Sequence, residues 1–209
     1  TEVPKEFNFR APATAFAALR SAGIDVVTLA NNHGMDYGEE GLLGEKLGCN
    51  ADVRGILRVR GMGTAYAHHG VMFGDTAWNF DGQEIFKRAV MAMTHASQEV
   101  LAKTGHTVDE IDLVVPHQAN LRIIESVAKR VGAPMDRVYV TVQRYGNMSS
   151  ATVPVALVDA LEEGLVKPGA LILMPAFGAG LTWCSHLVRW GERTTPIGTS
   201  AIELPPCNQ

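Results

Sequence analysis

The stretch IDLVVPHQANLRIIESVAKRVG, residues 111–132, carries the strongest fold signal in the sequence. Residues 111–115 are a short run of mostly apolar, β-branched residues that Pro116 closes, which indicates a buried strand. Apolar residues then recur at three- and four-residue steps through residues 121–131, and a glycine follows them, which predicts a helix. A buried strand that leads into a helix through a short polar connection is a unit of an α/β fold.

Strands and helices alternate on both sides of this stretch. The spacing of apolar residues and the positions of glycine and proline predict helices at 82–103, 121–131 and 151–162, and strands at 111–115, 138–142, 170–177 and 181–190. The last strand is expected to be antiparallel to the one before it. The order from residue 82 is therefore αβαβαββ, which predicts an α/β layered fold.

The first part of the chain has a different character. A helix is expected at residues 11–22 and a strand at 24–29, and together they would form a small α/β fragment. Glycines and glutamates over residues 38–48 suggest the start of a second helix, and the many glycines of residues 50–79 indicate short strands and loops. We therefore divide the chain into residues 1–45, a domain at 46–190, and a poorly ordered tail at 191–209.

Composition excludes several classes of function. The chain is 46% hydrophobic and 19% charged, which is typical of a globular protein. Its 18 basic and 22 acidic residues give a net charge of -4 without a basic run, so we expect no nucleic-acid partner. No apolar stretch is long enough to span a membrane, and the first residues do not resemble a signal peptide. Few and widely spaced cysteines fit a reducing compartment, so the expected localisation is cytoplasmic.

Three polar clusters stand at the ends of predicted elements, where α/β folds usually place their chemistry. His117 to Asn120 follow one strand, Tyr145 to Asn147 precede a helix, and residues 177–180 connect the last two strands. Taken singly, each cluster has a structural explanation. A histidine at a strand end is often structural, an asparagine after a glycine is often a turn residue or a helix cap, and paired glycines often form a tight hairpin.

Four strings of the sequence resemble one family when they are taken together. Residues 78–90 (WNFDGQEIFKRAV), 114–123 (VVPHQANLRI), 144–157 (RYGNMSSATVPVAL) and 176–183 (AFGAGLTW) are similar, in order and spacing, to the second half of β-ketoacyl-acyl carrier protein synthase III, a thiolase-fold enzyme of fatty acid biosynthesis. The resemblance covers about residues 46–190. It implies an acyltransferase activity, the decarboxylating Claisen condensation of malonyl-acyl carrier protein with an acyl-coenzyme A primer.

The resemblance also assigns catalytic roles. His117 and Asn147 correspond to the family pair whose side chains hydrogen-bond the thioester carbonyl oxygen of the malonyl group. Negative charge moves onto that oxygen as carbon dioxide leaves, and donors already aimed at it lower the barrier. Ala179 replaces the middle glycine of the family string. Only its backbone N–H would serve the second oxyanion hole, so the change of side chain is tolerable if its φ angle is negative.

Substrate and partner contacts follow from the same resemblance. Phe86 matches an aromatic residue near the primer pocket, and Gly82, Gln83 and Asn120 fall where coenzyme A or pantetheine is contacted. Arg122 matches a basic residue that docks acyl carrier protein, although an arginine on an exposed helix is by default a solvated charge. No metal or organic cofactor is expected beyond the thioester substrate.

The family's nucleophilic cysteine, which stands at the start of a buried helix in a small-residue setting, has no counterpart here. Cys49, Cys184 and Cys207 each lie in a different context. Without an acylated cysteine the condensation cannot begin. We therefore expect the chain to be inactive alone, and active only if a partner chain brings the half that carries the nucleophile. The expected protein partners are a complementary N-terminal half or a second copy of the chain in a homodimer.

A second resemblance covers residues 9–43, which are similar to a piece of capsule-biosynthesis proteins of the poly-γ-glutamate type, metallophosphatase-like proteins. In that family Asn32 would ligate a metal and His33 would face the substrate. The other metal-binding strings are absent, so we expect no tight metal site, and the segment also reads as a polar loop. Two families thus meet at about residues 43–50, as a fusion. The alternative functions are a metal-dependent phosphatase-like capsule protein fragment and a non-catalytic fusion fragment.

Overall fold

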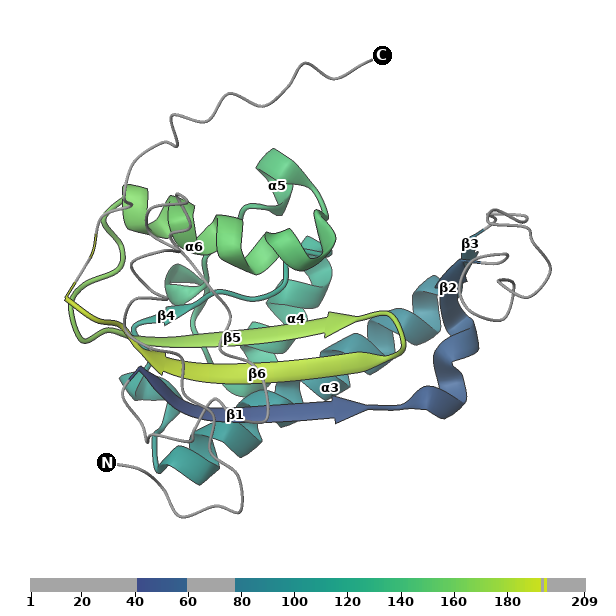
Figure 1. The fold of residues 1–209 in the computed structure, drawn as a ribbon, viewed down its shortest axis with the longest axis horizontal. Helices are drawn as coiled ribbons and strands as arrows, with labels where there is room; N and C mark the ends of the chain where they lie inside the picture. The colour runs from purple at the N-terminus through teal and green to yellow at the C-terminus, as the bar shows by residue number, and fades with distance from the viewer. Residues whose placement is uncertain (1–40, 60–77, 193, 195–209) are drawn as a thin grey trace, which may run out of the picture.

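A computed structural model describes residues 41–59, 78–192 and 194 (Figure 1). The helix expected at 11–22, the strand expected at 24–29 and nearly all of the expected tail lie outside the described residues. The region in which the sequence predicts the αβαβαββ order, from residue 82 to residue 190, is described in full.

The centre of the fold is a mixed four-stranded sheet with the strand order β1-β6-β5-β4 (Figure 1). β5 and β6 form an antiparallel hairpin, β1 pairs antiparallel with β6, and β4 pairs parallel with β5. β2 and β3 form a separate antiparallel pair. The strands are β1 (Leu42–Cys49), β2 (Leu57–Val59), β3 (Trp78–Phe80), β4 (Leu113–Val114), β5 (Leu171–Gly178) and β6 (Thr182–Arg189).

Helices begin and end where capping residues stand. The Asp81 side chain accepts a hydrogen bond from the Glu84 N–H at the start of α3, and Gly105 ends that helix with a φ of 70°. The helices are α3 (Gly82–Thr104), α4 (Leu121–Val131), α5 (Val142–Tyr145) and α6 (Thr152–Glu162), and the short 3-10 segments are η1 (Ala51–Ile56), η2 (Val108–Glu110), η3 (Met135–Arg137) and η4 (Ser149–Ala151). The three longer helices confirm the predicted ones to within one residue at each end.

Helices cover both faces of the sheet and make a three-layer structure (Figure 1). On one face, α3 and α4 bury residues such as Val100 and Ile124 against Leu173 and Leu187 of the hairpin strands. On the other face, α6 packs against β4 and β5. Each helix turns an apolar stripe toward the sheet, which confirms the predicted α/β layering.

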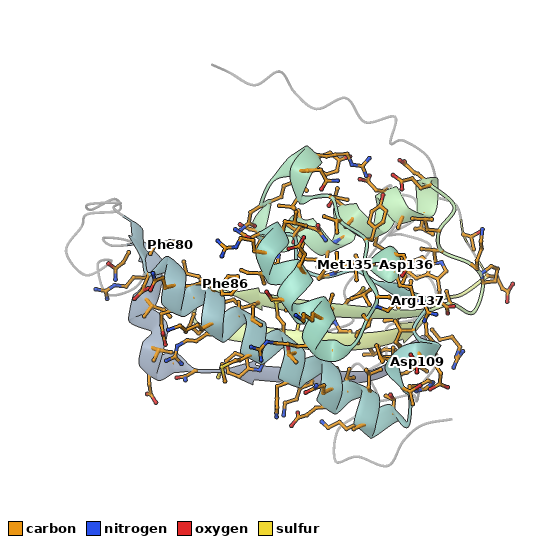
Figure 2. The ribbon with its side chains drawn as sticks, turned by 180° about the vertical axis from the view of Figure 1, so that it is seen from behind. Phe80, Phe86, Asp109, Met135, Asp136 and Arg137 are labelled. Atoms are coloured by element: carbon orange, nitrogen blue, oxygen red, sulfur yellow. The ribbon has the colours of Figure 1, made fainter. Side chains whose placement is uncertain are left out.

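The connections between layers are also tied by polar contacts. The Arg137 guanidinium donates hydrogen bonds to the backbone oxygens of Asp109 (2.9 Å) and Ile111 (3.2 Å). Figure 2 shows Arg137 and Asp109 on neighbouring connections of the fold. This contact holds η3 against the segment that leads into β4.

Among the helices of the described residues, none combines the length and the apolar character that a membrane crossing requires.

Two predicted elements are wrong. The strand expected at 138–142 is reduced to a single bridge between Val138 and Val114. The Tyr139 N–H still donates to the Val114 oxygen, but the N–H groups of Thr141 and Val142 bond to the Gln118 side chain instead of a strand. The helix start suggested at 38–48 is wrong where the structure describes it, since residues 42–49 form β1. Gly44 serves close packing there: a Cβ at this position would stand 2.5 Å from Thr104 Cγ2 on α3.

The position of β1 bears on the division of the chain. The expected boundary between residues 45 and 46 lies inside this strand, which pairs with β6 along most of its length, from Leu42 to Cys49. The boundary itself stays a prediction.

The first testable prediction concerns the core. Leu187 of β6 is fully buried against α3, so Leu187→Ala would leave a cavity and lower the free energy of unfolding by about 2–5 kcal/mol. Leu165→Ala is the matched control: Leu165 is 48% exposed, and we expect a change of no more than about 0.5 kcal/mol. Urea denaturation of both variants measures the difference. Equal losses would contradict the packing of α3 and α4 on the hairpin strands.

Candidate functional site

A cavity of about 1640 Å³ lies where the start of α3, the end of β4, the start of α6 and the β5–β6 turn come together. The site residues predicted from the synthase III resemblance all line it, although they come from separate segments of the chain. They are Gly82, Gln83, Phe86, His117, Asn120, Arg122, Asn147 and Ala179. The structure therefore brings the predicted residues to one place, while their individual roles stay predictions.

His117 is held at the end of β4 by backbone and side-chain contacts. Its backbone N–H donates to the backbone oxygen of Pro175 on β5 (2.9 Å), which continues the parallel pairing beyond the strand. Its Nδ1 atom lies 2.5 Å from the Thr152 hydroxyl oxygen at the start of α6. Burial lowers the pKa of His117 below its ordinary value of 6.5, so the imidazole is neutral at pH 7.

Asn147 reaches the cavity from a turn between α5 and α6. Gly146 precedes it with a φ of 67°, a left-handed conformation that glycine adopts without strain. The Asn147 Oδ1 atom accepts a hydrogen bond from the Ser149 N–H (2.9 Å). Because a backbone N–H can only donate, this contact identifies the engaged end of the amide as its oxygen. What Asn147 can still offer a ligand is the Nδ2 donor group.

Gln118 joins the segment that carries His117 to the segment that leads to Asn147. It is fully buried, and its Nε2 group donates to the backbone oxygens of Pro116 (2.8 Å) and Tyr139 (3.1 Å). Its Oε1 atom accepts from the N–H groups of Thr141 (2.8 Å) and Val142 (3.2 Å). These four bonds saturate the amide and fix the two segments relative to each other. The sequence analysis missed this role because a glutamine beside a histidine gives no sign of its burial.

A second polar cluster fastens α5 to α6. Arg144 Nη2 lies 2.7 Å from Asp159 Oδ2 and donates to the Tyr139 hydroxyl at 3.0 Å. Tyr145 donates to the other oxygen of Asp159 at 3.3 Å. Burial raises the pKa of Tyr139 to about 12, so its phenol stays protonated. Asp159 is buried on α6, and the cluster therefore anchors the turn that presents Asn147.

Ala179 stands in the turn between β5 and β6. The neighbouring Gly180 and Leu181 have positive φ angles of 85° and 38°. Ala179 is not among the described non-glycine residues with positive φ, so its methyl group causes no backbone strain. The condition for tolerating alanine in place of glycine is met, and the role of its backbone N–H stays a prediction.

An aromatic and basic pair lies on the wall that α3 and α4 share. The Arg122 guanidinium lies 5.8 Å from the centre of the Phe86 ring, a cation–π distance. Figure 2 shows Phe86 on α3 and Phe80 just before that helix. The Asn120 side chain accepts a hydrogen bond from the Arg122 N–H (2.9 Å) and so caps α4. This capping role of Asn120 was not expected from the sequence.

The described cysteines stand apart from the cavity. Cys49 is exposed at the end of β1, Cys184 lies on β6, and neither lines the cavity. Burial raises the pKa of the Cys184 thiol, which disfavours a nucleophilic thiolate. Cys207, Asn32 and His33 lie outside the described residues. Within residues 41–59 and 78–192, no cluster of three or more histidine, cysteine or carboxylate side chains suits a metal.

Two protein families match separate parts of the chain. Residues 101–190 match the family described as 3-oxoacyl-[acyl-carrier-protein (ACP)] synthase III C terminal. Residues 1–45 match the family described as bacterial capsule synthesis protein PGA_cap. The chain therefore joins a segment that resembles capsule synthesis proteins to a longer part that resembles the C-terminal half of synthase III, and the expected fusion is confirmed.

Curated relatives support the second assignment. The chain is 49% identical over 168 residues to β-ketoacyl-[acyl-carrier-protein] synthase III 2 of Vibrio cholerae. The matched region covers 80% of this chain and 46% of the relative. It is 53% identical over 110 residues to the synthase III of Roseiflexus sp., covering 53% of this chain and 33% of the relative. The chain thus spans half or less of the length of these relatives.

Solved structures show the same fold. The 3-oxoacyl-[acyl-carrier-protein] synthase III of Aquifex aeolicus superposes with a TM-score of 0.65 at 36% identity, over 74% of this chain and 46% of that protein. The priming β-ketosynthase of the R1128 polyketide pathway gives a TM-score of 0.65 at 30% identity, over 81% of this chain and 55% of that protein. The described part therefore has the predicted thiolase-like layered architecture.

The geometry around Gln118 generates a prediction. Gln118→Leu would leave two N–H groups and two carbonyl oxygens without their partner in a buried place. We expect the free energy of unfolding to fall by about 3 kcal/mol or more, measured by urea denaturation. Gln143→Leu is the control, because exposed Gln143 makes a single surface bond to the Val140 oxygen, and its effect should stay near about 0.5 kcal/mol. Similar effects of the two substitutions would show that Gln118 does not hold the segments together.

The lowered pKa of His117 generates a second prediction. Between the ordinary value of 6.5 and the lower folded-state pKa, the unfolded chain binds more protons than the folded protein. The free energy of unfolding should therefore decrease as the pH falls below 6.5. Burial lowers the pKa of His186 too, which adds a loss of the same sign. Urea denaturation from about pH 7.5 to 5.5 should show a shallower decrease for His117→Gln. An unchanged slope in that variant would contradict the prediction.

Proposed function

We propose that residues 46–190, which have the fold and motifs of the C-terminal half of a β-ketoacyl-acyl carrier protein synthase III, stabilise an enolate formed by decarboxylation of a malonyl thioester. The observation that carries this proposal is the presence of His117 and Asn147 on one cavity, each with its other polar end already engaged. In this role they are the catalytic residues, and the thioester oxygen accepts a hydrogen bond from both.

The chemistry needs only a place for negative charge. The bond between the α-carbon and the carboxylate of the malonyl group breaks, and carbon dioxide leaves. The electron pair moves into the enolate, whose oxygen lies between the Nε2–H of His117 and the Nδ2–H of Asn147. A proton from water then converts the enolate to an acetyl thioester. Each preorganised donor is worth about 3 kcal/mol of barrier, and no metal or organic cofactor takes part.

In a complete synthase the enolate carbon would instead attack an acyl group on a cysteine, and the thiolate would leave. We propose that this chain contributes to such a condensation only when a complementary N-terminal half or another subunit supplies the cysteine. Neither described cysteine lines the cavity, and Cys184 is held as a thiol. The backbone N–H of Ala179 would then stabilise the second oxyanion, formed at the acyl carbonyl.

The substrate contacts follow from the same cavity. We assign coenzyme A or pantetheine to the wall formed by Gly82, Gln83 and Asn120, and the acyl primer to the side of Phe86. Arg122 is exposed on α4 at the edge of the cavity, where a cation can meet an acidic acyl carrier protein. A cation–π contact with the Phe86 ring helps to hold the guanidinium in place.

The resulting prediction separates two activities. The 209-residue chain should slowly decarboxylate malonyl thioesters, but it should neither form an acyl-enzyme with acetyl-coenzyme A nor condense acetyl groups with malonyl-acyl carrier protein. Decarboxylation should fall about 100-fold in His117→Ala and in Asn147→Ala, because each variant lacks one donor. Release of carbon dioxide from labelled malonyl-coenzyme A measures the first activity, and mass spectrometry of the protein measures acylation.

The matched control for the two substitutions is Gln143→Ala, an exposed residue that does not line the cavity and should leave the rate unchanged. Acetylation of a cysteine accompanied by ketoacyl product would show that this chain carries its own nucleophile. Equal decarboxylation rates in the parent chain and both donor variants would reject the enolate site.

A further inference from the structure

The direction in which Asn147 points depends on how the short helix α5 is held, because this helix ends two residues before it. α5 has only four residues, and its N-cap residue Thr141 makes no capping bond with its side chain. A single helical turn is not stable by itself, since its few hydrogen bonds do not offset the loss of chain entropy. Contacts with other parts of the fold therefore fix α5.

Both ends of α5 have such contacts. At the start, Gln118 Oε1 accepts backbone N–H groups. At the end, the Asp159 carboxylate of α6 holds two side chains of α5, one on each oxygen. Its Oδ2 atom accepts from Arg144 Nη2 at 2.7 Å, and its Oδ1 atom accepts from the Tyr145 hydroxyl at 3.3 Å. Asp159, Arg144 and Tyr145 thus form a clamp, here called the α5 clamp, that joins α5 to α6 (Figure 1).

The burial of Asp159 makes the α5 clamp specific. This residue is only 8% exposed, whereas Arg144 and Tyr145 are exposed. A buried carboxylate is costly unless it is paired, and the hydrogen-bond partners of this one among the described residues are the two side chains of α5. Movement of α5 away from α6 would leave the charge without them. Arg144 also lies 3.4 Å from Glu163 Oε1, but Glu163 is exposed, so this contact contributes little.

α6 supports the turn that carries Asn147 from its other side as well. The Asn147 oxygen accepts the Ser149 N–H, and Ser149 begins η4, which continues directly into α6. The turn is therefore fastened to one helix at both of its ends. The Ser149 contact fixes which end of the amide is engaged, and the α5 clamp fixes where the backbone of Asn147 stands.

We propose that Asp159 is a positioning residue: by holding Arg144 and Tyr145, it keeps the backbone of Asn147 in the place from which the free Nδ2 group reaches the cavity. The structural part of this proposal rests on the contacts of the α5 clamp alone, whereas its importance for catalysis rests on the proposed function. Asp159 does not line the cavity, so it acts through Asn147 and not on the substrate.

The mobility of the Asn147 side chain tests the structural part. The full chain is labelled with 15N, Asn147→Ala assigns the side-chain NH2 signals by their loss, and 15N relaxation measures their motion. We expect a rigid amide in the parent chain and in Glu163→Ala, which keeps the α5 clamp. In Asp159→Ala the clamp is lost, so the order parameter of the Asn147 amide should fall and its signals should shift.

The rate of decarboxylation tests the catalytic part. Asp159→Ala should lower kcat toward that of Asn147→Ala, about 100-fold, with little change in KM, because the thioester still binds but meets a misplaced donor. Arg144→Lys keeps the cation of the α5 clamp and should retain a larger share of the rate than Arg144→Gln. Leu187→Ala is the control for general destabilisation: Leu187 is a core residue that does not line the cavity, so the folded variant should keep the parent kcat.

If Asp159→Ala does not fold, Tyr145→Phe, which removes a single hydroxyl from an exposed residue, should still produce a smaller change of the same kind. An Asn147 amide equally rigid in the parent chain and in the variants of the α5 clamp would overturn the proposal. Equal effects of Asp159→Ala and Glu163→Ala would also overturn it.

The two proposals fail separately in these measurements. A loosened Asn147 amide in Asp159→Ala, together with no decarboxylation by the parent chain, would support the role of Asp159 and reject the enolate site. Decarboxylation that depends on Asn147 but not on Asp159 would support the enolate site and reject the role of Asp159.

Discussion

The hydrogen bonds of the buried Gln118 side chain are the interaction on which the geometry of the site depends. They connect the end of β4 to the backbone of residues 139–142 and use every donor and acceptor of the amide. A buried amide with four good partners specifies one arrangement, because any shift would leave polar groups unpaired in the core. His117 and Asn147 inherit their relative positions from this arrangement.

One polar atom of each proposed catalytic side chain is already held by a protein contact, which decides what that side chain can offer a ligand. The Asn147 oxygen is occupied by the Ser149 N–H, and the nearest partner of His117 Nδ1 is a hydroxyl. The Asn147 amide is therefore left with its Nδ2 donor for the cavity. Burial disfavours the imidazolium, so the histidine adds no fixed positive charge to the cavity at pH 7. This combination suits an oxygen that becomes negative only during the reaction.

The exposure of parts of the cavity limits what this chain can do alone. Phe80 is 65% exposed and Asn147 is also exposed, so water reaches the proposed hydrogen bonds and competes with them. The matched region makes up 46% of the Vibrio cholerae relative, so more than half of that protein has no counterpart in the match. Activity well below that of a complete synthase is the expected consequence, because exclusion of water strengthens such interactions.

The sequence by itself determined the three long helices, the β5–β6 hairpin and the set of residues that share the cavity. Helical periodicity, capping residues and turn glycines are local signals, and the motif strings carry the site residues in order. Only the tertiary structure decided three other features. Residues 42–49 form a strand because they pair with the edge of β6. Residues 138–142 do not continue as one, since the N–H groups of Thr141 and Val142 bond to the Gln118 side chain. Thr152 meets His117 across 35 positions of sequence, and no local pattern encodes a contact of that range.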